Sequence, residues 1–290
     1  MVETKIIDGK QIAKEFREKI AEQVKKMKTT PKLAVILIGE HPASVIYVQN
    51  KKKAAASVGI DVDVYQLPYT EKQENVLKLI KELNASKKVH GILLQLPVPD
   101  HLDASELISA IDCRKDVDGL NPINVGQMVC QMPAMVPCTP LACVYLIKQV
   151  MPDLTGKTAL VIGRSNLVGR PLAQLLLQED CTLMQAHSKT KNLAELCQMA
   201  DIVVSAVGKV GLIKRDMIKE GAVVIDVGIN RLDDGKITGD VLFLEMLDKA
   251  GYVTPVPGGV GPMTVAMLLW NVVRAAQGQF SDCKELVVLR

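Results

Sequence analysis

The prediction of the fold depends most on the stretch ALVIGRSNLVGRP, residues 159–171. Its first four residues are apolar and belong to a strand pattern over 158–162, as in a strand that is buried on both faces. A turn containing Gly163 and Gly169 follows, and three leucines then recur at helical spacing: Leu172, Leu175 and Leu176. A strand, a glycine turn and a helix in this order predict an α/β domain with a parallel sheet.

Strands and helices alternate on both sides of this stretch. Before it, strand patterns lie at 32–39, 61–67 and 90–96, and helical patterns at 10–28, 43–58 and 71–83. After it, strand patterns lie at 182–186, 202–207, 223–227 and 252–254. This alternation predicts two α/β domains, each built on a mostly parallel sheet.

Residues 121–140 contain four prolines and one glycine, and we expect an irregular passage between the domains there. A helical pattern at 141–150 opens the second domain. The apolar helix after Thr264 is expected to return to the first domain. The predicted domains are therefore 1–140 plus 265–290, which binds the substrate, and 141–264, a Rossmann-like cofactor domain.

Composition excludes several classes of protein. The net charge is +3 and aromatic residues make up 3% of the 290 residues, which does not indicate a nucleic-acid surface. No uncharged apolar run approaches the roughly 18 residues that span a bilayer, and no signal peptide is visible. The seven cysteines form no CxxC pair and the four histidines have no metal-ligand spacing, so we expect a cytoplasmic protein without a metal site.

The run PVPGGVGPMT, residues 255–264, is too rich in proline and glycine for a helix or a central strand. It follows a strand pattern and precedes a helical one, which is where open α/β sheets bind ligands. Three glycines in four positions, Gly258, Gly259 and Gly261, leave the backbone bare, so that a flat ligand can lie on it. A structural turn is the alternative interpretation.

The turn at residues 163–169 is a variant of the dinucleotide-binding fingerprint, with Ser165 in place of the second glycine. Its backbone amides and the following helix N-terminus can hold a pyrophosphate. An NAD site carries an acidic residue after the next strand, whereas this chain has His187 and Ser188 there. Together with Arg164, this predicts NADP. The predicted cofactor residues are Gly163, Arg164, Ser165, Gly169, His187, Ser188 and Ile229.

Ile229 enters this set because two strand ends, at 203–208 and 225–230, finish in glycine-containing turns. Each can bring backbone close to the nicotinamide side of a dinucleotide. Within the second turn, Asp226 is more simply interpreted as an acceptor for turn amides.

Three further motifs carry polar side chains suited to a substrate site. Tyr47 and Lys51 are four residues apart and therefore share one face of a helix. Gln95 ends an apolar strand, and Asp118 can accept hydrogen bonds from a planar heterocycle. Taken singly, Tyr47 suits a core position and Lys51 a solvated surface. Asp116 is expected to be structural.

These motifs together resemble the methylenetetrahydrofolate dehydrogenase/cyclohydrolase family of the FolD type. YxxxK, QLP, KDVDGL, PCTP, GRSxxVGxP, HSKT and PVPGGVGPMT stand in the family's order between about residues 7 and 279. The resemblance implies a homodimer in one-carbon metabolism and purine biosynthesis that uses NADP and a folate substrate. It implies catalytic roles for Lys51, Tyr47 and Gln95, and substrate binding by Tyr47, Asp118, Pro257, Gly258 and Gly259.

The implied activity is oxidation of 5,10-methylenetetrahydrofolate to the 5,10-methenyl compound, followed by hydrolysis to 10-formyltetrahydrofolate. Two alternatives stay open from the residues alone. One is an NADP-dependent dehydrogenase that acts on another small molecule. The other is a non-catalytic NADP-binding protein, against which the joint presence of Tyr47 and Lys51 argues.

Overall fold

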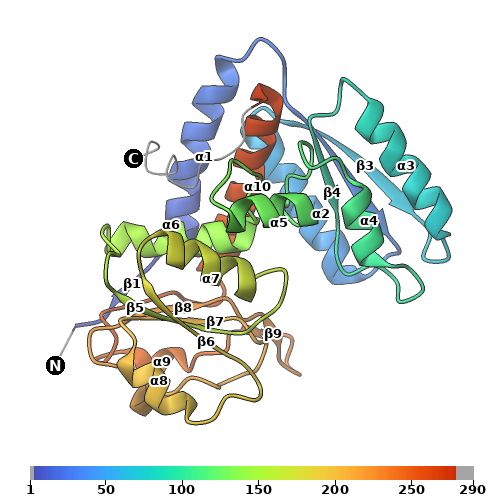
Figure 1. Ribbon diagram of the computed structural model, residues 1–290. Helices are drawn as coiled ribbons and strands as arrows, with labels where there is room; N and C mark the ends of the chain where they lie inside the picture. The colour runs from blue at the N-terminus through green and yellow to red at the C-terminus, as the bar shows by residue number, and fades with distance from the viewer. Residues whose placement is uncertain (1–2, 279–290) are drawn as a thin grey trace. The chain divides into compact units, whose positions relative to one another are not determined.

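The structure is a computed structural model that describes residues 3–278. The chain divides into two compact units (Figure 1). Unit 1 comprises the residues up to Lys14 together with Thr139–Thr264, and unit 2 comprises Glu15–Cys138 together with the residues from Val265 on. The residues before Glu15, which the sequence groups with the substrate domain, belong to unit 1 because a strand there joins the sheet of that unit. Residues 279–290 of the predicted substrate domain lie outside the described residues.

Unit 1 is built on a six-stranded parallel sheet. Its strand order is β1 (Lys5–Ile6), β11 (Tyr252–Val253), β8 (Val223–Asp226), β7 (Ile202–Ser205), β5 (Thr158–Ile162) and β6 (Thr182–Ala186). A separate two-stranded antiparallel pair is formed by β9 (Asn230–Arg231) and β10 (Ile237–Thr238). Since all strands of the large sheet run the same way, the loops that follow them gather at one edge.

Helices cover both faces of this sheet. Helices α6 (Cys138–Val150) and α7 (Gly169–Gln178) lie on one face, and α8 (Leu193–Met199) and α9 (Phe243–Met246) on the other (Figure 1). Leu160, Val203 and Val224 are neighbours across three strands and pack into one buried cluster with residues of α8 and α9. Burial on both faces explains why these strands are continuously apolar in the sequence.

Unit 2 is built on a three-stranded parallel sheet of order β3 (Asp61–Leu67), β2 (Lys32–Ile38) and β4 (Gly91–Leu94). Helices α3 (Gln73–Ala85) and α4 (Ala104–Ala110) cover one face, where Val76, Ile80 and Leu107 pack on the strands. Helices α1 (Gly9–Lys25), α2 (Pro42–Ser57) and α10 (Val260–Gln277) lie on the other side of the sheet (Figure 1).

The C-terminal helix returns to the first domain, as predicted. From Val265 on, α10 belongs to unit 2. Trp270 meets Phe16 of α1 edge to face, with ring centroids 6.1 Å apart. Asn271, which is completely buried, donates to the carbonyls of Val117 and Val136 at 2.9 and 3.0 Å. Apolar packing and buried hydrogen bonds therefore hold this helix in unit 2.

The prediction of an irregular segment over 121–140 is wrong for its first half, where α5 (Pro122–Val129) forms. Pro122 stands in the first turn of this helix, where its missing N–H has no partner to lose. Asn121 caps the helix, because its side-chain oxygen accepts from the Ile123 amide at 2.8 Å. Pro122 is therefore a helix start signal and not a breaker.

Candidate functional site

A buried lysine forms the centre of the polar cluster in unit 2. Helix α2 places Tyr47 and Lys51 one turn apart, and the Lys51 Nζ lies 4.7 Å from the centroid of the Tyr47 ring. The same Nζ donates to Gln95 Oε1 over 3.0 Å. Lys51 is 7% exposed and Gln95 is 8% exposed, so this is a desolvated hydrogen bond. The structure thus brings together the three residues that were predicted to be catalytic.

The three-stranded sheet of unit 2 holds Gln95 in place at the end of β4. Gln95 follows β4 directly, and its backbone amide continues the ladder to Ile36 O at 2.9 Å. Its side-chain Nε2 donates to Leu96 O at 2.6 Å. With the amide nitrogen engaged in this way, the Oε1 atom is directed at Lys51.

Asp118 joins the cluster because its segment runs beside β4. Ile92 N donates to Lys115 O at 2.7 Å, and Ile92 and Asp116 form a parallel bridge. This approach requires a glycine on β4, since a Cβ at Gly91 would lie 2.5 Å from a methyl group of Val117. The half-buried carboxylate of Asp118 is close enough to the Lys51 ammonium for each to shift the pKa of the other.

Asp116 has the structural surroundings that the sequence predicts for it. Its carboxylate accepts hydrogen bonds from Gly119 N at 3.1 Å, from Asn121 N at 2.7 Å and from Asn124 Nδ2 at 2.9 Å. Burial nevertheless raises the pKa of Asp116 to about 6, against the effect of these donors. The carboxylate therefore organises the turn that leads from Asp118 to α5.

The electrostatics of the cluster favour a lysine that loses its proton more readily than usual. Burial lowers the pKa of Lys51, while the nearby Asp118 carboxylate acts in the opposite direction. Burial raises the pKa of Asp118, and here Lys51 opposes the shift. The pKa of Tyr47 rises to about 12, mainly through burial, so its hydroxyl stays protonated near neutral pH.

Sequence reasoning missed two residues of this cluster, Cys138 and Asn271. The Cys138 thiol donates to Val117 O at 3.2 Å and interacts with the Asp118 carboxylate. Burial raises the pKa of this thiol well above its usual value, which keeps it neutral. Asn271 Nδ2 is 3.6 Å from Cys138 Sγ. A signal for Asn271 did exist, since it is a lone amide within an apolar helical run.

In unit 1, the turn after β5 is shaped by two glycines. Gly163 has φ +125°, and a Cβ there would lie 2.5 Å from Ala206 O. A Cβ at Gly169 would lie 2.3 Å from Gly163 O, so the start of α7 packs directly on the turn. Ser165 Oγ accepts from the amides of Val168 and Gly169 at 3.2 and 3.3 Å. This is the close strand-to-helix packing that a dinucleotide-binding turn needs.

Further residues predicted to bind the cofactor lie at the same edge of the sheet. Gly163 N donates to Ala186 O at 2.9 Å, which sets the turn after β5 beside His187 and Ser188 after β6. Arg164 and Ser188 are exposed. His187 Nδ1 accepts from Lys189 N at 3.1 Å, so His187 helps to build its own turn. Two polar side chains are thus available to a ligand next to the glycine turn.

Two buried acidic residues lie beside the ends of β7 and β8: Asp226, the last residue of β8, and Asp240, which follows β10. Asp226 accepts from Gly228 N, Asp240 N and Val241 N at 2.9–3.0 Å, in line with its predicted role as an acceptor for turn amides. Burial raises the pKa of Asp226 to about 6. Ile229, the predicted cofactor residue here, is 65% exposed. Asp240 was missed, because a single Gly-Asp step carries no sequence signal for burial.

The loop at 255–264 lies in unit 1. Gly258 has φ +109°, and its carbonyl accepts from Lys10 N at 2.9 Å. A Cβ at Gly259 would lie 2.6 Å from Pro255 O, and the Gly259 carbonyl in turn fills the space beside Gly9. Packing within the chain therefore requires Gly259, whereas a Cβ at Gly258 would meet only Pro255 at 3.8 Å. Pro257 is exposed.

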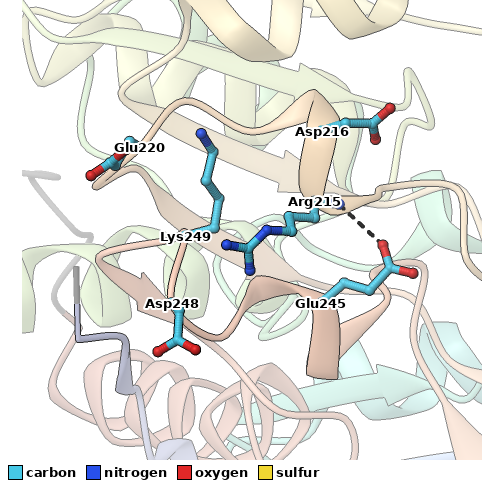
Figure 2. A pocket seen from close by; sticks show the side chains of 6 residues that line it. All are labelled: Arg215, Asp216, Glu220, Glu245, Asp248 and Lys249. Carbon is cyan, nitrogen blue, oxygen red and sulfur yellow. Dashed lines mark hydrogen bonds between the residues drawn. The ribbon is translucent and has the colours of Figure 1, made fainter. Parts of the chain in front are cut away.

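A pocket of about 510 Å³ elsewhere on unit 1 is lined by charged side chains (Figure 2). They are Arg215, Asp216, Glu220, Glu245, Asp248 and Lys249. Two hydrogen bonds fix the position of Arg215. Its backbone amide donates to the Glu245 carboxylate at 3.2 Å, and its Nη1 donates to Leu247 O at 2.8 Å. None of the predicted site residues lines this pocket.

Within residues 3–278, no cluster of three His, Cys, Asp or Glu side chains is arranged to hold a metal ion. No helix in the same range combines the length and apolarity that crossing a bilayer requires.

Unit 1 has a parallel sheet with a glycine turn at its carboxyl edge, and unit 2 has a polar cluster around one buried lysine. These features define the class of the protein, a two-unit enzyme that binds a dinucleotide. Residues 7–118 match the family model of the tetrahydrofolate dehydrogenase/cyclohydrolase catalytic domain. Residues 137–280 match the model of the NAD(P)-binding domain of the same family. The chain therefore belongs to the tetrahydrofolate dehydrogenase/cyclohydrolase family.

Individual relatives agree with this assignment. The chain is 52% identical to the bifunctional protein FolD of Moorella thermoacetica over 94% of its own length and 98% of the relative's. Among solved structures, it is similar to the FolD enzyme of Campylobacter jejuni, with a TM-score of 0.93, 46% identity and coverage of 94% and 99%. It is also similar to the Trypanosoma brucei FolD complexed with NADP and an inhibitor, with a TM-score of 0.91, 39% identity and coverage of 96% and 98%.

Proposed function

We propose that the protein oxidises 5,10-methylenetetrahydrofolate with NADP⁺ and hydrolyses the 5,10-methenyl product to 10-formyltetrahydrofolate. The observation that carries the proposal is the buried contact of Lys51 with Gln95 and Tyr47, in the unit that holds the catalytic-domain match. The glycine turn of unit 1 supports a dinucleotide partner for this reaction. NADP⁺, when bound, supplies the acceptor for the hydride.

Folate binding is assigned to Tyr47 and Asp118. The Tyr47 ring offers a flat apolar face to an aromatic ring of the substrate. The Asp118 carboxylate, as an acceptor-only group, suits the amino and ring N–H donors at the edge of a pterin. Pro257 and the side-chain-free backbone of Gly258 and Gly259 are proposed to bind folate as well. Gly258 supports this best, because its α-carbon is not packed as closely as that of Gly259.

Lys51 is proposed to transfer the proton in the hydrolytic step. Hydride removal leaves a methenyl cation that the adjacent nitrogens of the folate stabilise, so this step needs no strong base. Water then adds to the methenyl carbon, and the neutral amine of Lys51 takes the proton that the water releases. The lowered pKa of Lys51 makes this neutral form accessible, and Gln95 holds the amine in one position.

NADP is assigned to unit 1 through Gly163, Ser165 and Gly169 at the pyrophosphate, and through Ile229 on the nicotinamide side. Arg164, His187 and Ser188 are proposed to bind the 2′-phosphate. The residues present fit this group, because the exposed Arg164 and Ser188 follow neighbouring strands and no acidic side chain follows β6 directly. A carboxylate at that point would repel the phosphate.

One assay separates this proposal from its rivals. Purified protein is mixed with 5,10-methylenetetrahydrofolate and NADP⁺, and the methenyl absorbance and NADPH formation are followed. Formation of NADPH with transient methenyl absorbance supports both activities. Binding of NADP⁺ without turnover of this folate would instead indicate a dehydrogenase of another small molecule or a non-catalytic protein.

A homodimer and a cytoplasmic location belong to the same proposal. The first rests on the family resemblance and is tested by sedimentation velocity. The second rests on the cysteines, six of which have free thiols within residues 3–278, and fractionation of the source cells tests it.

The functional domains are proposed as 1–140 plus 265–290 for folate and 141–264 for NADP. The strand before Lys14 then serves the NADP unit structurally.

A further inference from the structure

Asp240 is a completely buried carboxylate that accepts five hydrogen bonds. Its Oδ2 accepts from Ser205 Oγ at 2.9 Å, from Val207 N at 2.9 Å and from Gly208 N at 3.3 Å. Its Oδ1 accepts from Lys209 N at 2.8 Å and from Asn230 Nδ2 at 3.2 Å. One side chain therefore determines the course of the loop after β7 and the orientation of Asn230.

These groups lie at the edge of the sheet where the cofactor turn lies. Ser205 is the last residue of β7 and pairs with Ile162, the last residue of β5. The next residue, Ala206, places its carbonyl where a Cβ of Gly163 would be, at 2.5 Å. The loop that Asp240 holds is thus in contact with the glycine turn proposed for the pyrophosphate.

The strand order indicates which half of a dinucleotide this loop faces. The sheet runs β8, β7, β5, β6, and the glycine turn follows β5. The proposed 2′-phosphate residues follow β6, on one side of that turn. The other half of the dinucleotide, which carries the nicotinamide, then extends over the ends of β7 and β8. Asp240 is hydrogen-bonded to both ends, to the last residue of β7 through Ser205 Oγ and to the last residue of β8 through its own amide and the Asp226 carboxylate.

The backbone of Asp240 is in turn held in position by Asp226. The Asp226 carboxylate accepts from the backbone amides of Asp240 and Val241. A Cβ at Gly228 would lie 2.2 Å from Asp240 Oδ1, and a Cβ at Gly239 would lie 1.9 Å from Asp226 Oδ2. The two carboxylates occupy the space that side chains at these glycines would otherwise take, so both carboxylates pack directly against the backbone.

We infer that Asp240 is a positioning residue for the nicotinamide side of the cofactor site, acting through the backbone of residues 207–209 and through Asn230. It touches no reacting atom, and its effect is to preset the loop against which the nicotinamide is oriented for hydride transfer. The inference rests on the proposed function, because it assumes a dinucleotide at this edge. It predicts that Asp240 matters for oxidation and not for hydrolysis, which uses no cofactor.

The test uses the full chain and the variants Asp240→Asn and Ser205→Ala. The amide introduced by Asp240→Asn keeps the shape of the carboxylate but presents N–H groups to donors, whereas Ser205→Ala removes one of the five donors. Asp201→Asn is the matched control. Asp201 lies before β7, at the opposite edge of the same sheet, and its carboxylate likewise accepts from a backbone amide, that of Thr158 at 2.9 Å.

Four quantities are measured for each protein: the NADP⁺ dissociation constant, the NADP⁺ KM, the dehydrogenase kcat and the cyclohydrolase rate without cofactor. For Asp240→Asn we expect kcat/KM for NADP⁺ to fall by roughly 10-fold or more, the scale of a misplaced reacting group, with cyclohydrolase unchanged. Ser205→Ala should show a smaller loss in the same direction, and Asp201→Asn none.

Unchanged dehydrogenase kinetics in Asp240→Asn would overturn the inference. So would parallel loss of both activities in Asp240→Asn combined with normal dehydrogenase kinetics in Ser205→Ala, since Asp240 would then serve the fold alone. If Asp240→Asn does not fold but Ser205→Ala selectively loses dehydrogenase activity, the inference is supported. A parent protein without dehydrogenase activity would overturn the proposed function itself, which keeps the two failures distinct.

Discussion

The Lys51 ammonium donates to Gln95 Oε1 over 3.0 Å, although the two residues stand on different elements, 44 positions apart in the chain. Lys51 comes from the third turn of α2 and Gln95 from the end of β4. A buried ammonium loses the water that would otherwise solvate it, so a neutral amide oxygen at this distance is a partial substitute. The pairing keeps the amine in one place without neutralising its charge. A carboxylate in place of the Gln95 amide would instead raise the pKa of Lys51 and keep the ammonium protonated.

Replacement of Lys51 is the most direct test of its proposed role. We expect Lys51→Met to lower the cyclohydrolase rate by roughly 10²–10⁴-fold, as for loss of a general acid–base group. Dehydrogenase activity should persist in part, and 5,10-methenyltetrahydrofolate should accumulate. Stopped-flow absorbance resolves formation and decay of the methenyl compound. Lys52→Met, at the exposed neighbouring position, is the control and should leave both rates intact. Normal methenyl decay in Lys51→Met would rule out Lys51 as the proton acceptor.

The pH dependence of hydrolysis should report the lowered pKa of Lys51. Because the neutral amine is the active form, the cyclohydrolase rate should rise with pH through the pKa of Lys51, below the ordinary value of 10.5. Asp118 opposes the lowering, so Asp118→Asn should move this limb of the pH–rate profile to lower pH. A limb that moves to higher pH in Asp118→Asn would contradict the assignment of the titrating group.

Asp118 is proposed to bind folate for both reactions. We expect Asp118→Ala to raise the folate KM of the dehydrogenase and of the cyclohydrolase by similar factors, since both use one site. The loss should be about 1.5–3 kcal/mol of binding free energy, the scale of hydrogen bonds to a charged group. Asp100→Ala, at an exposed position after the QLP motif, is the control. Unchanged folate affinity by titration calorimetry would leave Asp118 a structural role only.

Cofactor preference tests the exposed arginine beside the glycine turn. We expect the parent protein to prefer NADP⁺ over NAD⁺, and Arg164→Ala to weaken NADP⁺ binding by about 1.5–3 kcal/mol while NAD⁺ binding barely changes. Arg215→Ala, in the charged pocket of Figure 2, removes an arginine of the same unit and should affect neither cofactor. Dissociation constants follow from fluorescence titration. Equal losses for both cofactors in Arg164→Ala would show that Arg164 does not bind the 2′-phosphate.

Stability should depend on pH through the buried Asp116. Its pKa is about 6 in the folded protein and near 3.8 in the unfolded chain, so the folded state holds the proton more tightly. The contribution of this group to the free energy of unfolding is therefore largest below pH 4. It decreases by on the order of 3 kcal/mol as the pH rises to about 6, and is constant above that.

Urea unfolding of the parent and of Asp116→Asn across this range isolates the effect, since the variant cannot titrate at that position. The unfolding free energy of the parent minus that of the variant should fall between pH 4 and pH 6. A difference that is independent of pH, or that rises, would contradict the raised pKa.

The alternation of elements could be predicted from the sequence because burial on both faces leaves a local record. Strand 158–162 has the predicted bounds and is buried along nearly its whole length. Strands 61–67 and 182–186 also have the predicted bounds, although they lie at sheet edges and are partly exposed. The segment at 121–140 was less readable. Pro122 can end or begin a helix, and only the Asn121 cap and the packing of α5 decide between the two.

The polar site was predicted only where its residues fall within one local element or one motif. Tyr47 and Lys51 share a helix face at a spacing of four, which is a property of the chain alone. The Lys51–Gln95 hydrogen bond, the bridge that brings Asp118 beside β4 and the buried Asp240 join segments distant in sequence. Residue type and spacing therefore determine the elements and their amphipathic faces. Tertiary packing decides which polar groups are desolvated and paired, because burial and partner choice depend on segments that no local pattern relates.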